Sequence, residues 1–127
     1  MMHTVFCDGN AKRISWSIKT EQDTVEQFRE QAEIYVDQVS NIQATYIALH
    51  VAIFWGIGVF IIKNGDTIKI KLESDEMIQH LSTNQASNDK IAEDKKKFIN
   101  MLSAQRSLLY QYEKITHEQN ISSKMLL

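Results

Sequence analysis

The stretch SNIQATYIAL, residues 40–49, opens the most apolar segment of the chain. Ser40 is a residue type favoured at helix N-caps, and Gln43 stands three residues later, so the pair has the pattern of a capping box ahead of an apolar run. This pattern predicts a helix that runs from Gln43 through at least Trp55. The other predicted elements are arranged around this helix.

The end of this central helix is ambiguous in the sequence. The glycines that follow weaken helical structure, and residues 58–62 followed by Asn64-Gly65 have the pattern of a β-hairpin into residues 67–72. The alternative is a helix that continues and ends between Trp55 and Lys63. We favour the helix and keep the hairpin as the alternative.

The same segment is long and apolar enough to raise the question of a membrane span. Residues 44–62 contain no charged side chain, and about 20 apolar residues are needed to span a bilayer. Thr45, Tyr46 and His50 argue against a span, as does the scarcity of positive charge in the flanking residues. We therefore expect no membrane contact and a helix that is buried on all sides in a soluble core.

Length and composition suit one compact domain over residues 1–127. Of the 127 residues, 43% are apolar, which is enough for a hydrophobic core. The net charge of −2 gives no global attraction to nucleic acid, so any such contact needs a local basic patch. The single Cys7 excludes an internal disulfide, and because no signal peptide is visible we expect a cytoplasmic protein.

Two segments ahead of the central helix have strand patterns. Residues 3–7 form an apolar run that ends at Asp8-Gly9-Asn10, which places a carboxylate at the tip of a strand. Residues 13–19 alternate as a half-buried strand does, with apolar Ile14, Trp16 and Ile18 on one face and Arg13, Ser15, Ser17 and Lys19 on the other. The two segments are predicted to pair as an antiparallel hairpin. After a loop, a third strand is predicted at residues 30–38.

The second half of the chain predicts a strand at residues 67–72, helices at 74–81 and 91–106, and a last strand at 108–115. In the longer of these helices the predicted buried stripe consists of Ile91, Phe98 and Leu102. Strands and helices in this order predict an α/β domain, in which a mixed sheet carries helices packed on its faces.

Four segments resemble motifs of the type 1 ribonucleases H, in the order in which that family has them. Asp8-Gly9-Asn10 is similar to the catalytic Asp-Gly at the end of the family's first strand. Residues 41–49 resemble the T-N-N-Q-A-E-Y-x-A-L motif of its central helix, with Thr45 in place of the glutamate. Glu73-Ser74 is similar to the Asp-Ser after the fourth strand, and residues 115–120 resemble the V-P-R-E-x-N turn. The resemblance implies a ribonuclease-H-like α/β fold, a mixed β-sheet flanked by helices.

The resemblance also implies a set of catalytic positions. The family cleaves RNA in RNA–DNA hybrids with two Mg²⁺ ions about 3.5–4 Å apart, which carboxylate oxygens hold. Asp8 and Glu73 would be the two remaining catalytic and metal-binding acids. Thr45 and Lys124 stand at the two other carboxylate positions. A shifted alignment would make Asp75 the third carboxylate instead of Glu73. Two lost acids and a gained ammonium predict weak metal binding.

Further positions are implied as substrate contacts. In the family, such residues reach the sugar-phosphate backbone and the 2′-hydroxyls of the hybrid, and the matching residues here are Gly9, Asn10, Asn41, Gln43, Ser74 and His117. The alternative is structural, because Asn41 and Gln43 could cap the helix and His117 could be a surface histidine. Lys124 is hypothesised to contact a phosphate directly.

Together these patterns predict a degenerate ribonuclease-H-like protein without catalytic activity or cofactor, which binds an RNA–DNA hybrid or another nucleic acid. The first alternative is a weakly active ribonuclease H that uses Mg²⁺ or Mn²⁺ through Asp8, Glu73 and Asp75. The second is a scaffold that forms homo-oligomers through the hydrophobic residues 54–62.

Overall fold

Five strands form one sheet in the computed structural model, which describes residues 1–127. In chain order the elements are β1 (Met2–Gly9), β2 (Arg13–Thr20), β3 (Asp23–Glu30), α1 (Asn41–Gly58), β4 (Thr67–Leu72), α2 (Asp75–Ser82), α3 (Lys90–Arg106) and β5 (Leu109–Lys114). Two short 3₁₀ turns, His117–Gln119 and Ser123–Leu126, follow the last strand.

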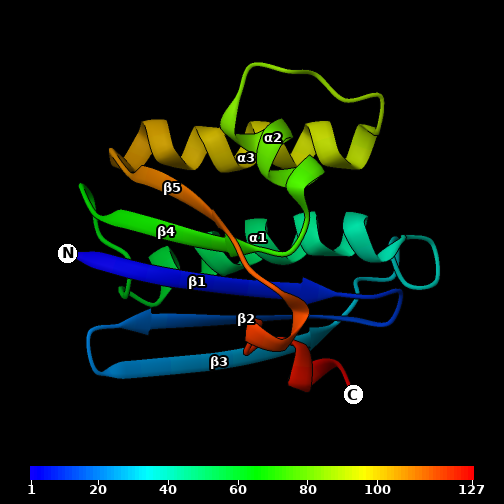
Figure 1. Ribbon diagram of the computed structural model, residues 1–127, viewed down its shortest axis with the longest axis horizontal. Coiled ribbons are helices and arrows are strands. Elements are labelled where there is room, and N and C mark those ends of the chain that lie inside the picture. Colours follow the sequence, from blue (N-terminus) through cyan, green and yellow to red (C-terminus); the bar gives the residue numbers. More distant parts are fainter.

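The sheet is mixed, with β1 at its centre. Its strand order is β3-β2-β1-β4-β5. The first three strands form an antiparallel meander, whereas β1, β4 and β5 run parallel. In Figure 1 helix α1 lies behind the sheet and the C-terminal residues cross in front of it. The predicted α/β architecture, a mixed sheet flanked by helices, is confirmed.

The central helix begins as its sequence predicts. The Ser40 hydroxyl accepts a hydrogen bond from the Gln43 amide, and the Gln43 side chain accepts one from the Ser40 amide, which completes the capping box. The helix continues to Gly58, so the alternative hairpin is wrong. Gly56 is closely packed, because a Cβ there would lie 2.7 Å from Ile62 Cδ1 and 3.0 Å from Ile18 Cδ1.

Helix α1 supplies much of the hydrophobic core. Its buried face packs against β1 and β2, and it also packs against α3. None of the helices in the chain combines the length and the apolar character that a bilayer crossing requires.

The third strand lies earlier in the chain than predicted. β3 covers Asp23–Glu30 and pairs antiparallel with β2, whereas residues 33–38 form turns. The strand is exposed on both faces, so its sequence has no apolar alternation to reveal it. The apolar residues of the following segment instead fold into tight turns, in which the Tyr35 and Val36 amides both donate to the Ala32 carbonyl.

Two predicted buried faces also differ from the structure. Ser15 and Ser17 on β2 are buried rather than exposed, because the C-terminal residues cover this part of the sheet. In α3, Phe98 is 42% exposed and Ile99 is buried in its place. Phe98 stacks on His50 at the edge of the helix interface, with ring centroids 5.0 Å apart.

Candidate functional site

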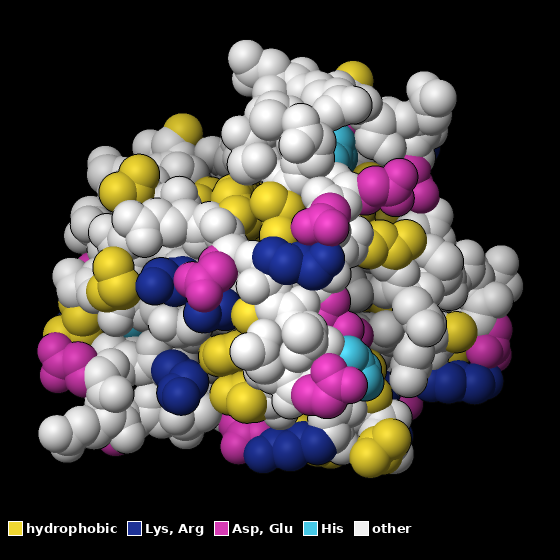
Figure 2. Space-filling model, viewed as in Figure 1, with side chains coloured by type: hydrophobic (Ala, Val, Ile, Leu, Met, Phe, Trp, Pro, Cys, Tyr) yellow, Lys and Arg dark blue, Asp and Glu magenta, His cyan; other side chains and the backbone are white.

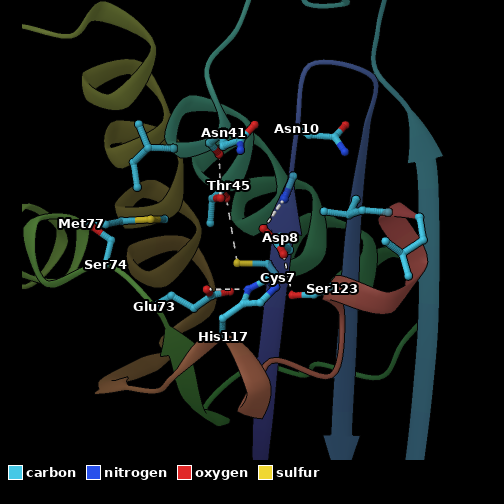
Figure 3. Close-up of a pocket in the computed structure, with 14 residues that line it drawn as sticks. Cys7, Asp8, Asn10, Asn41, Thr45, Glu73, Ser74, Met77, His117 and Ser123 are labelled. Carbon is cyan, nitrogen blue, oxygen red and sulfur yellow. Dashed lines mark hydrogen bonds and ion pairs between the residues drawn. The ribbon is translucent and has the colours of Figure 1, made fainter.

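A pocket of about 470 Å³ lies where the carboxyl ends of β1 and β4 meet the start of α1. The two strands are parallel neighbours, and their register pairs Phe6 with Lys71. Two residues further along each strand, Asp8 and Glu73 therefore reach the same edge of the sheet. Figure 3 shows Glu73 and His117 pointing toward each other, with Asp8 and Ser123 beside them.

The position of Asp8 depends on close contact between β1 and α1. Asp8 accepts a hydrogen bond from the Gly9 amide through Oδ1, over 2.8 Å. A Cβ on Gly9 would lie 2.7 Å from the Ala44 Cβ and 2.8 Å from the Ala44 carbonyl. Glycine at this position lets the strand end approach the helix.

Both carboxylates of the pocket are hydrogen-bonded on each of their oxygens. The second oxygen of Asp8 accepts a 2.6 Å bond from the Ser123 hydroxyl. Glu73 pairs with His117 Nδ1 at 2.9 Å through one oxygen and accepts a 2.7 Å bond from the Asn120 amide through the other. The donors to Glu73 and the serine donor to Asp8 all come from the C-terminal residues.

A buried polar network fixes these C-terminal residues on the sheet. Asn120 also donates to the Cys7 carbonyl over 2.9 Å. The Ser15 hydroxyl donates to the Ser122 carbonyl, and the Ser17 and Ser122 hydroxyls lie 2.9 Å apart. Because these groups are buried, each needs its partner, and the network holds Ser123 against Asp8.

Two ionisable groups in the pocket have shifted pKa values. The hydrogen bond and the charge of Glu73 raise the pKa of His117 above its usual value, which favours the imidazolium form. Burial raises the pKa of the Cys7 thiol, so this cysteine stays protonated and is unsuited to act as a nucleophile.

The donor set does not suit a pair of catalytic metal ions. One ligand atom from each of Asp8, Glu73 and His117 lies within 4.8 Å of the others, but only two of these ligands are carboxylates. Thr45 lines the pocket, yet its hydroxyl donates to the Asn41 carbonyl of its own helix over 2.9 Å. A two-ion centre needs several converging carboxylates, and this pocket has two.

No protein-family model and no curated protein matches the chain. Solved structures do. RNase H1 from Halobacterium salinarum is 16% identical, with a TM-score of 0.79 over 99% of this chain and 94% of its own. The N-terminal RNase H domain of a Mycobacterium tuberculosis protein gives 12% identity and a TM-score of 0.78 over 99% and 95%. LC11-RNase H1, in complex with an RNA/DNA hybrid, is 16% identical, with a TM-score of 0.67 over 97% of this chain and 91% of its own.

The chain has the ribonuclease H fold. Within this fold, most of the residues that the sequence singles out line one pocket. They are Asp8, Gly9, Asn10, Asn41, Thr45, Glu73, Ser74 and His117. Figure 3 places Asn10 and Asn41 at one end of the pocket, away from Glu73.

Some of these residues also have structural roles. The Asn10 side chain accepts hydrogen bonds from two backbone amides of its own turn, and Ser74 is the N-cap of α2. Gln43 does not line the pocket, because its side chain completes the cap of α1 and donates to Asp89 over 2.9 Å. The geometry of Gln43 therefore agrees with the alternative that this residue caps the helix.

Two predicted positions lie outside the pocket. Asp75 is exposed and pairs with Lys114 at 3.0 Å, and Glu73 rather than Asp75 lines the pocket. Lys124 pairs with Glu26 on β3 at 3.0 Å and does not line the pocket. Its neighbour Ser123 contacts Asp8 instead.

Sequence reasoning missed Ser123 as a pocket residue and did not assign Asn120 to the site. Asn120 was visible as the last residue of the turn motif in residues 115–120. No pattern in the sequence marks Ser123. The resemblance placed the fourth carboxylate position at Lys124, whereas the side chain that reaches Asp8 is that of Ser123, one residue earlier.

Proposed function

We propose that this protein binds nucleic acid, with an RNA–DNA hybrid as its preferred ligand, and does not cleave it. The main support for this proposal is that both carboxylates of the pocket already have hydrogen-bond partners within the protein. Each oxygen of Asp8 and Glu73 already accepts a hydrogen bond from the protein. A divalent cation would compete with these donors and with the charge of a protonated His117.

The polar groups around the pocket support binding of a sugar-phosphate backbone. The amides of Asn10 and Asn41 stand at one end, and the cationic form of His117 is favoured at the other. RNA-containing duplexes are recognised largely through their shape and through phosphate and 2′-hydroxyl contacts. LC11-RNase H1, which has the same fold, was solved with an RNA/DNA hybrid.

Binding and cleavage are tested separately with one labelled RNA–DNA hybrid. Fluorescence anisotropy in EDTA measures binding without metal, and gel electrophoresis after incubation with Mg²⁺ or Mn²⁺ measures cleavage. We expect binding in EDTA, weakened in the variant Asn10→Ala/Asn41→Ala, and no cleavage above that of Asp8→Asn. Metal-dependent cleavage that Asp8→Asn abolishes would overturn the proposal.

A residual hydrolytic activity is the second candidate function. The cluster of Asp8, Glu73 and His117 favours it, because these groups are close enough to share one divalent ion. The cleavage assay with Mn²⁺ decides between the two candidates.

Self-association is favoured by a different observation. Phe54 and Phe60 are 63% and 79% exposed at the second half of α1 and just beyond it, and exposed apolar patches often mark protein contacts. Light scattering of the purified protein would give a dimer mass if this surface self-associates, and a monomer mass at high concentration would refute self-association.

A further inference from the structure

A basic hollow lies on the sheet face opposite α1, at the end of the sheet away from the pocket. Its lining includes Lys19 on β2, Thr4 and Phe6 on β1, and Lys69 and Lys71 on β4. Helix α1 lies on the other face of the sheet (Figure 1). The C-terminal residues bind to β2 at Ser15 and Ser17, which lie nearer to the pocket than Lys19 does. Figure 2 shows basic side chains, in dark blue, grouped on the left of this face.

The sheet register explains why the lysines converge. Thr4 pairs with Lys19 on β2 and with Lys69 on β4. Neighbouring strands lie about 4.7–4.9 Å apart, so the two lysines stand on either side of Thr4 on three adjacent strands. On the next row, Phe6 pairs with Lys71. Lysine and threonine side chains that line one hollow supply ammonium and hydroxyl donors for a phosphate group.

The lysine positions are partly fixed before any ligand binds. Glu113 on β5 bridges Lys71, at 2.7 Å, and Lys69, at 3.6 Å. Lys71 is the less exposed of the two, with 19% of its side chain accessible. Lys19 forms no ion pair. Packing and pairing restrain two of the cations, so little conformational freedom is lost on binding.

The charge of the hollow is opposite to that of the whole chain. Three ammonium groups face two carboxylates, Glu21 and Glu113, whereas the net charge of the chain is −2. Phe6 is only 8% exposed, so it offers no ring face on which a base could stack. These features suit a ligand that is recognised through its phosphates rather than its bases.

We propose that the hollow formed by Lys19, Lys69, Lys71 and Thr4 binds the phosphodiester backbone of a nucleic acid, as a second anchoring surface apart from the pocket. The ligand class is that of the proposed function, on which the inference rests, but the surface is different. Binding here is independent of sequence and sensitive to salt, because the contacts are ionic.

The test compares three variants with the wild type by fluorescence anisotropy of a labelled RNA–DNA hybrid between about 50 and 200 mM salt. The first variant removes the charges of the hollow, Lys19→Gln/Lys69→Gln/Lys71→Gln. The second removes three exposed charges elsewhere and serves as the matched control, Lys63→Gln/Lys90→Gln/Lys97→Gln. The third is the pocket variant, Asn10→Ala/Asn41→Ala. Circular dichroism confirms that each variant is folded.

We expect the hollow variant to bind at least tenfold more weakly at the lowest salt. Its slope of log affinity against log salt should fall in magnitude by about 2 to 3, one unit for each lost phosphate contact. The control variant should retain the affinity and the slope of the wild type. Equal losses in the hollow variant and the control would overturn the inference, since only overall charge would then matter.

Two further outcomes separate this inference from the proposed function. If only the pocket variant loses affinity, the proposed function stands and the inference about the hollow fails. If the wild type does not bind the hybrid at all, both fail.

Discussion

Replacing Gly9 by alanine should destabilise the protein through a clash between β1 and α1. The added Cβ would meet the Cβ, carbonyl carbon and carbonyl oxygen of Ala44 at 2.7 to 2.8 Å. These atoms belong largely to helix backbone, which cannot move without disturbing the core around α1. Overpacking of this kind costs about 1–3 kcal/mol of unfolding free energy. With a urea m-value of about 2 kcal/mol/M, the transition midpoint falls by about 1 M.

The assay is urea denaturation followed by the fluorescence of Trp16, which is buried, and Trp55. Gly58→Ala is the matched control, because a Cβ at that position meets no atom within 4 Å. Alanine is a better helix residue than glycine, so Gly58→Ala should raise the stability by up to about 1 kcal/mol. Equal midpoints for Gly9→Ala and the wild type would refute the close approach of β1 to α1.

Three other changes test separate parts of the structure. Burial disfavours the charged form of Asp66, but hydrogen bonds from Lys63, His3 and the chain's amino group outweigh it and lower the pKa of Asp66 to about 2. Because this folded-state pKa lies below that of the unfolded chain, about 2 kcal/mol of stability is present above pH 4 and lost as the pH falls toward 2. Asp66→Asn should remove that part of the acid dependence in urea titrations, and an unchanged dependence would contradict the assignment. Tyr46→Phe leaves the buried His80 Nδ1 without its 2.7 Å partner, which should cost about 1 kcal/mol in the same assay; a cost near zero would mean that another donor replaces the phenol. Thr45→Glu adds a carboxylate to the pocket of Asp8 and Glu73, and calorimetry should show at least about tenfold tighter Mn²⁺ binding. No gain would mean that the bonds within the pocket exclude the ion.

The sequence predicted the parts of the fold that carry a local signal. The capping box at Ser40 and Gln43 and the alternation of residues 67–72 each marked an element that the structure contains. β3 carries no such signal. It is exposed on both faces and exists because β2 offers its backbone groups for pairing, which is a long-range property of the chain.

The residues of the candidate site that lie at the ends of strands and helices could be predicted from the sequence. Asp8 and Glu73 end parallel neighbouring strands, and Asn41 begins the central helix. The contribution of Ser123 depends on how the C-terminal residues lie over β2, through buried contacts to Ser15 and Ser17. Serines that alternate with apolar residues on a strand are predicted to be solvent-exposed. Their burial becomes visible only in the structure.

The bonds that link Asp8 to Ser123 and Cys7 to Asn120 have a consequence for biosynthesis. They join residues separated by 115 and 113 positions, and a contact cannot form before both of its residues have left the ribosome. The β1–β2–β3 meander can pair early, because its strands follow one another directly. The pocket is completed only when the C-terminal residues reach the sheet, so a nascent chain that stalls before Asn120 would present Asp8 and Glu73 without their serine and asparagine partners.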